Sequence, residues 1–87
     1  MKRRVIITGG SKGIGKAISA RFAKEGSDIY LLASNKENLE STKSELQNKY
    51  NVNVYYYAAD LKTKIGCKNS IKSVEKEFKN FDTLIFS

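Results

Sequence analysis

Four short apolar runs recur along the chain, and longer stretches with helical spacing separate them. The runs are rich in β-branched and aromatic residues and are short enough to be buried strands. They cover Arg4–Thr8, Asp28–Ala33, 52–58 and Thr83–Phe86. We therefore predict four strands over these ranges.

Between the runs, apolar residues recur three or four positions apart, which is the spacing of one helix face. The first helix is predicted to begin near Gly13 and to end at Lys24, before Gly26. The second follows a capping-box sequence that starts at Ser34, and the third covers about 63–79, with its first turn weakened by Gly66. The residues that carry the helical spacing are Ile14, Ala17, Ile18, Phe22, Leu39, Leu46, Tyr50, Cys67, Ile71, Val74 and Phe78.

Strands that alternate with helices through short connections indicate an α/β fold with a parallel sheet and right-handed crossovers. The sequence has no proline, repeat or low-complexity tract, so we expect one domain over residues 1–87. No apolar run approaches the roughly 18 residues of a membrane helix. The apolar run behind the basic start, Val5 to Ile7, is far too short for a signal peptide. We expect a cytoplasmic chain with no membrane partner.

The net charge of +7 makes nucleic-acid binding a function to consider. The lysines are, however, interleaved with glutamates, and no block of five or more like charges occurs. Solvated helix faces and attraction for an anionic cofactor explain the charge better, so we expect no nucleic-acid partner. Cys67 is the only cysteine and histidine is absent, which predicts neither an internal disulfide nor a metal site.

Two phosphate-binding loops can be matched to GGSKGIGKA, which runs from Gly9 to Ala17. A nucleoside-triphosphate loop, G-x-x-x-x-G-K-[ST], needs a hydroxyl at its last position to hold Mg²⁺. Ala17 stands there and offers no oxygen, which argues against that loop. The strict dinucleotide pattern G-x-G-x-x-G also fails, because Ile18 stands where glycine or alanine is required.

What does match is T-G-x-x-x-G-x-G, from Thr8 to Gly15. In this loop the sequence resembles the short-chain dehydrogenase/reductase family, which implies a Rossmann-type doubly wound parallel sheet and an NAD(P)(H) cofactor. Gly9 would allow a tight turn out of the strand, Gly13 a close approach of the backbone to the pyrophosphate, and Gly15 close packing of helix on sheet. The resemblance also places Ser11, Lys12 and Ile14 in the cofactor-binding loop.

A second match follows the third predicted strand, where Asp60-Leu61 occupies the family's position for an Asp and an apolar residue. The resemblance implies that this aspartate accepts a hydrogen bond from the adenine amino group. An acid on the ribose hydroxyl would favour NAD, but Ala33, Ser34 and Asn35 supply none at the expected distance. Lys12 lies where NADP-preferring members often carry a basic residue. We expect NADP(H) to be favoured over NAD(H), with Ser34 and Asn35 as further contacts.

The family's catalytic Tyr-x-x-x-Lys pair is missing, since no tyrosine here has lysine four residues later. The resemblance covers all 87 residues but only the first part of a family member. We therefore expect the cofactor-binding fragment of an oxidoreductase, with no catalytic residue of its own, that would be homo-oligomeric at full length. Two alternatives remain open, a non-catalytic dinucleotide-binding module and a degenerate remnant.

Overall fold

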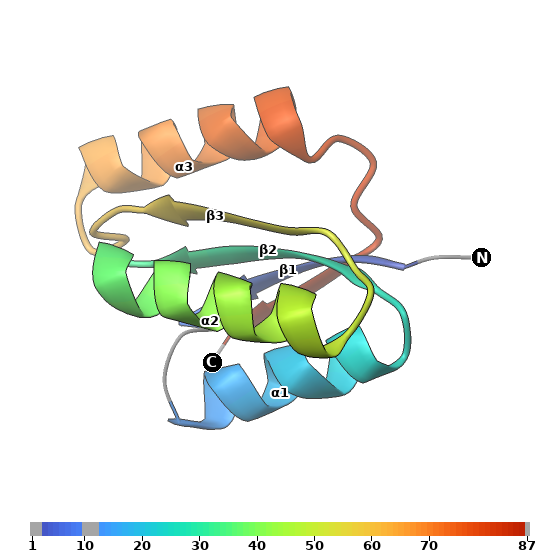
Figure 1. Cartoon of the computed structure of the whole chain (residues 1–87). Coiled ribbons are helices and arrows are strands. Elements are labelled where there is room, and N and C mark those ends of the chain that lie inside the picture. The colour runs from blue at the N-terminus through green and yellow to red at the C-terminus, as the bar shows by residue number, and fades with distance from the viewer. Residues whose placement is uncertain (1–2, 10–12, 87) are drawn as a thin grey trace.

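The fold is known from a computed structural model that describes residues 3–9 and 13–86 (Figure 1). Strands and helices alternate along the whole of this part of the chain. They are β1 (Arg4–Thr8), α1 (Gly13–Lys24), β2 (Asp28–Ala33), α2 (Lys36–Lys49), β3 (Val54–Ala58), α3 (Lys64–Glu77) and β4 (Thr83–Phe86). Three strands have their predicted bounds, whereas β3 begins at Val54 and α3 ends at Glu77, each two residues short of the prediction.

The four strands form one parallel sheet in the order β3-β2-β1-β4. Helices α1 and α2 lie on one face of this sheet and α3 lies on the other, so the molecule has three layers (Figure 1). The predicted Rossmann-like α/β fold with a doubly wound parallel sheet is therefore confirmed. Among the described residues, no helix has both the length and the apolar character needed to cross a membrane.

Alternate residues of the inner strands supply two separate cores, because successive strand side chains point to opposite faces. On β2, Ile29 and Leu31 join the core beneath α1 and α2, while Tyr30 and Leu32 join the core beneath α3. Strand β1 divides in the same way. The core under α3 is aromatic, with the Tyr30 and Phe78 ring centroids 5.4 Å apart. Strands buried on both faces explain why the runs are continuously apolar.

Helices α1 and α3 both approach the sheet through a row of small residues spaced by four. The buried row is Gly15, Ser19 and Ala23 on α1, and Gly66, Ser70 and Val74 on α3. In each helix the serine hydroxyl donates to the glycine carbonyl oxygen four residues earlier, at 2.8 Å, which satisfies a buried polar group.

This packing corrects the helix faces predicted from apolar spacing. Ile14 and Ile71 are 77% and 58% exposed, and Ala17 and Cys67 are exposed as well. The predicted weakening at Gly66 stays a prediction, and this glycine is in addition buried where α3 starts. Small residues bring a helix close to a sheet but carry little hydrophobic signal, so the spacing of larger residues indicated a neighbouring face.

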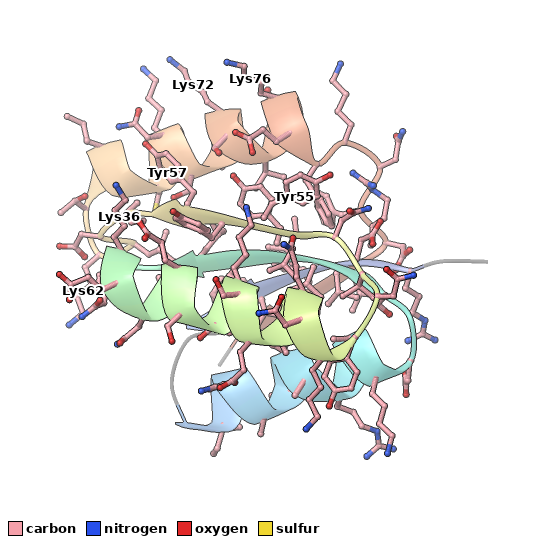
Figure 2. All side chains as sticks on the ribbon, in the orientation of Figure 1. Lys36, Tyr55, Tyr57, Lys62, Lys72 and Lys76 are labelled. Atoms are coloured by element: carbon pink, nitrogen blue, oxygen red, sulfur yellow. The ribbon has the colours of Figure 1, made fainter. Side chains whose placement is uncertain are left out.

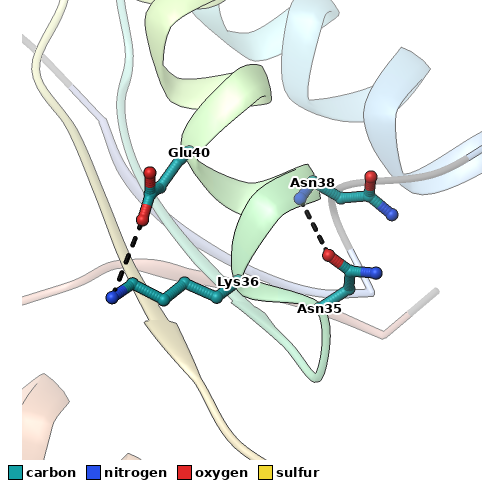
Figure 3. Close-up of polar contacts among 4 residues, drawn as sticks. All are labelled: Asn35, Lys36, Asn38 and Glu40. Atoms are coloured by element: carbon teal, nitrogen blue, oxygen red, sulfur yellow. Dashed lines mark hydrogen bonds and ion pairs between the residues drawn. The ribbon is translucent and has the colours of Figure 1, made fainter.

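The start of α2 differs from the capping box predicted at Ser34. Asn35 is the N-cap, and its side-chain oxygen accepts a hydrogen bond from the Asn38 backbone N–H at 2.9 Å (Figure 3). Lys36 and Glu40 then form an ion pair of 3.8 Å on the exposed side of the first turn (Figure 3). Serine and asparagine are about equally good N-caps, so composition alone does not decide between neighbouring positions.

Candidate functional site

The candidate site lies at the carboxyl ends of the strands, where parallel α/β sheets bind their ligands. The chain winds from β1 outward to β3 and then returns to place β4 on the other side of β1, so the strand order reverses beside β1. A cavity of about 350 Å³ opens at this edge. It is lined by Thr8, Gly9, Leu32, Ala33, Ser34, Asn35, Ala59, Asp60, Leu61 and Lys62. Six residues predicted to bind a cofactor thus meet in one place: Thr8, Gly9, Ser34, Asn35, Asp60 and Leu61.

The first wall of the cavity is the turn that leaves β1. Gly9 has a φ of +69°, a left-handed conformation that glycine adopts without strain. Its N–H donates to the Leu32 carbonyl oxygen at 2.7 Å, which ties the turn to the end of β2. The Thr8 hydroxyl donates to the Ile85 carbonyl oxygen at 3.4 Å, towards β4. Thr8 and Gly9 therefore lie where the strand order reverses.

Among the described residues of the loop, Gly13, Ile14 and Gly15 do not line this cavity. Gly13 begins α1 with a φ of +50°, and a Cβ there would meet no other described atom within 4 Å. Gly15 lies on the buried face of α1, as its predicted packing role requires, whereas Ile14 is exposed. Ser11 and Lys12 lie outside the described residues, so the predicted contact of Lys12 with a phosphate stays a prediction.

The second wall is the end of β2 and the start of α2. The Asn35 side-chain oxygen is committed to the helix cap, so only its amide nitrogen remains to donate to a ligand. Ser34 is exposed and makes no hydrogen bond with the described residues. No carboxylate comes from residues 33–35 on this wall.

The third wall is the connection from β3 to α3, which holds Asp60 by several hydrogen bonds. The Asp60 carboxylate accepts from the Lys62 backbone N–H at 2.9 Å. The Asp60 carbonyl oxygen accepts from the Thr63 hydroxyl at 3.0 Å and from the Thr63 N–H at 3.2 Å. The Thr63 hydroxyl in turn caps α3 by accepting from the Gly66 N–H at 2.9 Å. Asp60 is thereby fixed while one carboxylate oxygen stays available.

Two residues of this wall were missed by the sequence reasoning. Gly66 packs so tightly against the connection that a Cβ would lie 2.7 Å from the Asp60 carbonyl carbon, inside van der Waals contact. Lys62 lines the cavity and is exposed at its rim (Figure 2). The signal for Lys62 was its place directly after Asp60-Leu61. Nothing in the sequence distinguished Gly66 from a glycine that merely weakens a helix.

A larger apolar cavity of about 700 Å³ opens between α3 and β4. Thr8, Leu32 and Leu61 line both this cavity and the cavity at the strand ends, so the two are neighbours. Phe86, which is 78% exposed, stands on the outer wall. A ligand of mixed character could extend from the polar cavity across the end of β1 into the apolar one.

The described residues include no arrangement suited to acid–base catalysis. Burial raises the pKa of Tyr30, and loss of solvation together with the Glu40 carboxylate raises the pKa of Tyr56. A catalytic tyrosine needs its pKa lowered towards neutrality, so both shifts have the wrong direction. No group of three or more cysteine, aspartate or glutamate side chains in the described part could hold a metal ion.

Comparison with known proteins agrees with this geometry. The family model "short chain dehydrogenase" matches residues 3–87. A probable 2,4-dienoyl-CoA reductase of Bacillus subtilis is 37% identical over 84 residues, covering 97% of this chain and 33% of the relative. L-sorbose reductase from Gluconobacter frateurii, solved with NADPH and L-sorbose, superposes with a TM-score of 0.90 at 37% identity, covering 95% of this chain and 32% of that one.

An NAD⁺-bound xylitol dehydrogenase superposes with a TM-score of 0.86 at 30% identity, covering 94% of this chain and 31% of its own. The solved relatives thus include complexes with either dinucleotide. The chain spans about a third of the length of these relatives. The match of the family model over nearly every residue shows that the chain belongs to the short-chain dehydrogenase family.

Proposed function

We propose that the chain binds the adenosine and pyrophosphate part of NAD(P)(H) in an oxidoreductase that transfers hydride between the nicotinamide and a carbonyl or alcohol carbon. The observation that carries the proposal is the gathering of Thr8, Gly9, Ser34, Asn35 and Asp60 around one cavity at the carboxyl ends of the strands. Family membership favours this function over a non-catalytic binding module or a degenerate remnant.

Each wall of the cavity has a role in the proposal. The glycine turn and the start of α1 would receive the pyrophosphate, because free N–H groups and the positive end of the helix dipole favour negative charge there. Asp60 would accept from the adenine amino group through the carboxylate oxygen that its own turn leaves available. Ser34 and the Asn35 amide would donate to the ribose or to a phosphate on it.

We further propose that NADP(H) is preferred over NAD(H). Residues 33–35 bring no carboxylate that would repel a 2′-phosphate, and Lys62 adds a cation to the cavity rim. Among the described lining residues, the only acid is Asp60, whose carboxylate accepts from the Lys62 N–H. Lys12 would add a second cation from the glycine loop. The NADPH complex of L-sorbose reductase supports this preference, and the solved relatives also include the NAD⁺-bound xylitol dehydrogenase.

Hydride transfer also needs groups that these 87 residues do not contain, since no Tyr-x-x-x-Lys sequence occurs in them. We therefore propose from the family that the whole protein transfers hydride to or from a carbonyl or alcohol substrate and that it assembles into a homo-oligomer. A cytoplasmic location belongs to the same proposal.

The deciding experiment is titration calorimetry of the protein with NADPH and NADH, and with the half-ligands 2′,5′-ADP and 5′-AMP. We expect NADPH to bind more tightly than NADH by about tenfold or more, equivalent to roughly 1.4 kcal/mol. The half-ligands should show the same order, because the difference lies at the 2′-position. Equal affinities would remove the NADP preference, and no binding of any of the four would overturn the dinucleotide role.

A further inference from the structure

Four lysines on the exposed side of α3 are spaced by four residues along almost the whole helix. They are Lys64, Lys68, Lys72 and Lys76, referred to below as the α3 lysine row. Figure 2 shows Lys72 and Lys76 extending outward from α3, away from the sheet, with Lys62 at the strand-end edge of the molecule. Since an α-helix rises about 1.5 Å per residue, the row is about 18 Å long.

The positive charge of this row is poorly compensated. The ion pairs found among the described residues join Lys16 to Glu45, Arg21 to Glu25 and Lys36 to Glu40, and none involves the row or Lys62. Against the four lysines, α3 carries only Glu75 and Glu77. The row is thus a local excess of positive charge and not a pattern of alternating signs.

The basic surface is continuous with the proposed cofactor site. Along α3 there is a shallow depression of about 620 Å³, whose charged lining residues are Lys62, Lys64, Lys68, Lys72 and Glu75. Leu61 and Lys62 line both this depression and the cavity at the strand ends. A ligand that moves along the depression from Lys72 towards Lys64 therefore arrives at the cavity wall that contains Asp60.

We propose that Lys62 and the α3 lysine row form a capture surface that speeds the association of the polyanionic dinucleotide with its cavity. The proposal rests on the proposed function and adds a kinetic role for Lys62 at the cavity rim and for the four lysines beyond it. A row of like charges that leads into a site concentrates oppositely charged ligands near it and raises the association rate. The residence time of the bound ligand is not affected by lysines that do not touch it.

Electrostatic screening gives the proposal a quantitative signature. The Debye length is about 8 Å at an ionic strength of 0.15 M and about 30 Å at 0.01 M. At 0.15 M the first turn of α3, with Lys64, lies within a screening length of the cavity rim, whereas Lys76 lies about two screening lengths beyond Lys64. At 0.01 M the whole row acts on the approaching ligand. At high salt, the contribution of each lysine to the association rate constant should therefore decrease from Lys64 to Lys76. At low salt, the four contributions should become similar.

The test is stopped-flow measurement of NADPH association and dissociation rates in the whole protein, for the single variants Lys64→Gln and Lys76→Gln. The matched control is Lys24→Gln, because Lys24 is an exposed lysine at the last position of α1, on the other face of the sheet. All three changes remove one positive charge and keep a polar side chain of similar length.

At 0.15 M we expect Lys64→Gln to lower the association rate constant by about two- to threefold and the other two variants to match the wild type. At 0.01 M we expect Lys76→Gln to lower it as well, and by more than Lys24→Gln. Dissociation rates should not change. Equal reductions by Lys64→Gln and Lys24→Gln, or an effect confined to dissociation, would overturn the capture surface. A wild-type protein that binds no dinucleotide would overturn the proposed function and the capture surface together.

Discussion

Gly66 and Asp60 lie so close together that no side chain fits between them. A Cβ on Gly66 would lie within 2.8 Å of the Thr63 hydroxyl oxygen and would overlap the Asp60 carbonyl oxygen, both parts of the turn that presents the Asp60 carboxylate. Gly66 is therefore a positioning residue: its missing side chain lets α3 begin directly against the loop that carries Asp60.

The change Gly66→Ala should displace this turn and weaken the proposed hydrogen bond from adenine to Asp60. A lost hydrogen bond of about 1 kcal/mol corresponds to roughly fivefold weaker NADPH binding, and overpacking should also destabilise the fold by about 1–3 kcal/mol. The specific readout is the ratio of affinities for NADPH and its hypoxanthine analogue, which lacks the amino group. The wild type should prefer adenine, and the variant should lose much of that preference. An unchanged ratio in a folded variant would show that Gly66 does not position Asp60.

The N-cap of α2 can be tested by comparing two neighbouring substitutions. Asn35→Ala removes the side-chain oxygen that accepts from the Asn38 N–H, and should lower the free energy of unfolding by about 1 kcal/mol. Ser34→Ala should change it by only a few tenths of a kcal/mol, within the usual range for exposed positions. Urea denaturation followed by circular dichroism measures both. A larger loss from Ser34→Ala would restore the capping box first expected from the sequence.

Replacing Lys12 with glutamate should reverse the cofactor preference. The new carboxylate would repel a 2′-phosphate and could accept from a ribose hydroxyl, so NADPH binding should weaken by about tenfold or more while NADH binding holds or improves. Calorimetric titration with both dinucleotides measures the change, and Lys24→Glu provides the same charge change on an exposed helix end. Equal NADPH affinity in Lys12→Glu and in the wild type would exclude Lys12 as the selecting residue.

Asp82 should make the stability of the fold depend on acid pH. Its carboxylate accepts from the Arg4 backbone N–H at 3.0 Å, which ties the start of β1 to the start of β4, and from the adjacent Thr83 hydroxyl at 2.8 Å. The hydrogen bond from Arg4, followed by that from Thr83, lowers the pKa of Asp82 below its ordinary value of 3.8. The unfolded chain then binds more protons than the native state near that pH, so this stabilisation is present above pH 3.8 and is lost as the pH falls through the lowered pKa.

The corresponding measurement is the melting temperature of the wild type and of Asp82→Asn between pH 2.5 and 6, which spans the ordinary aspartate pKa of 3.8. The variant should melt below the wild type at the upper end of this range, and the difference should shrink as the acid limit is approached. A constant difference across the range would mean that ionisation of Asp82 does not contribute.

The order of elements could be predicted from the sequence because buried parallel strands are continuously apolar. The bounds of β1, β2 and β4 followed directly from their runs. The start of β3 did not, because Val52 is buried just before the strand and continues the same pattern. Helix faces were less predictable, since the buried side of α3 runs through Gly66 and Ser70, whose hydrophobic signal is small.

Residues of the candidate site could be predicted where the local backbone or the end of a strand requires a particular residue type. Gly9 stands at a positive φ, and Asp60 follows the end of β3, which is why loop pattern and spacing were enough to select them. The roles of Lys62 and Gly66 depend on how α3 packs against the connection that precedes it. The spacing of these residues follows no known motif, so the sequence alone did not select them. The sequence also does not distinguish the lysines of a solvated helix face from a lysine at the cavity rim, because this difference depends on the three-dimensional arrangement.

Burial of β2 on both faces constrains how this sequence can change in length. Its adjacent residues Tyr30 and Leu31 belong to different cores, so inserting or deleting one residue within the strand would exchange the side chains on one side of the change between the two faces. Where Tyr30 lies on the shifted side, it would leave its hydroxyl contact with Ser73 and enter the aliphatic layer beneath α1 and α2. Over evolution, gaps between homologues should therefore accumulate in the connections, while the spacing from Asp28 to Ala33 is kept even where the residues themselves are replaced.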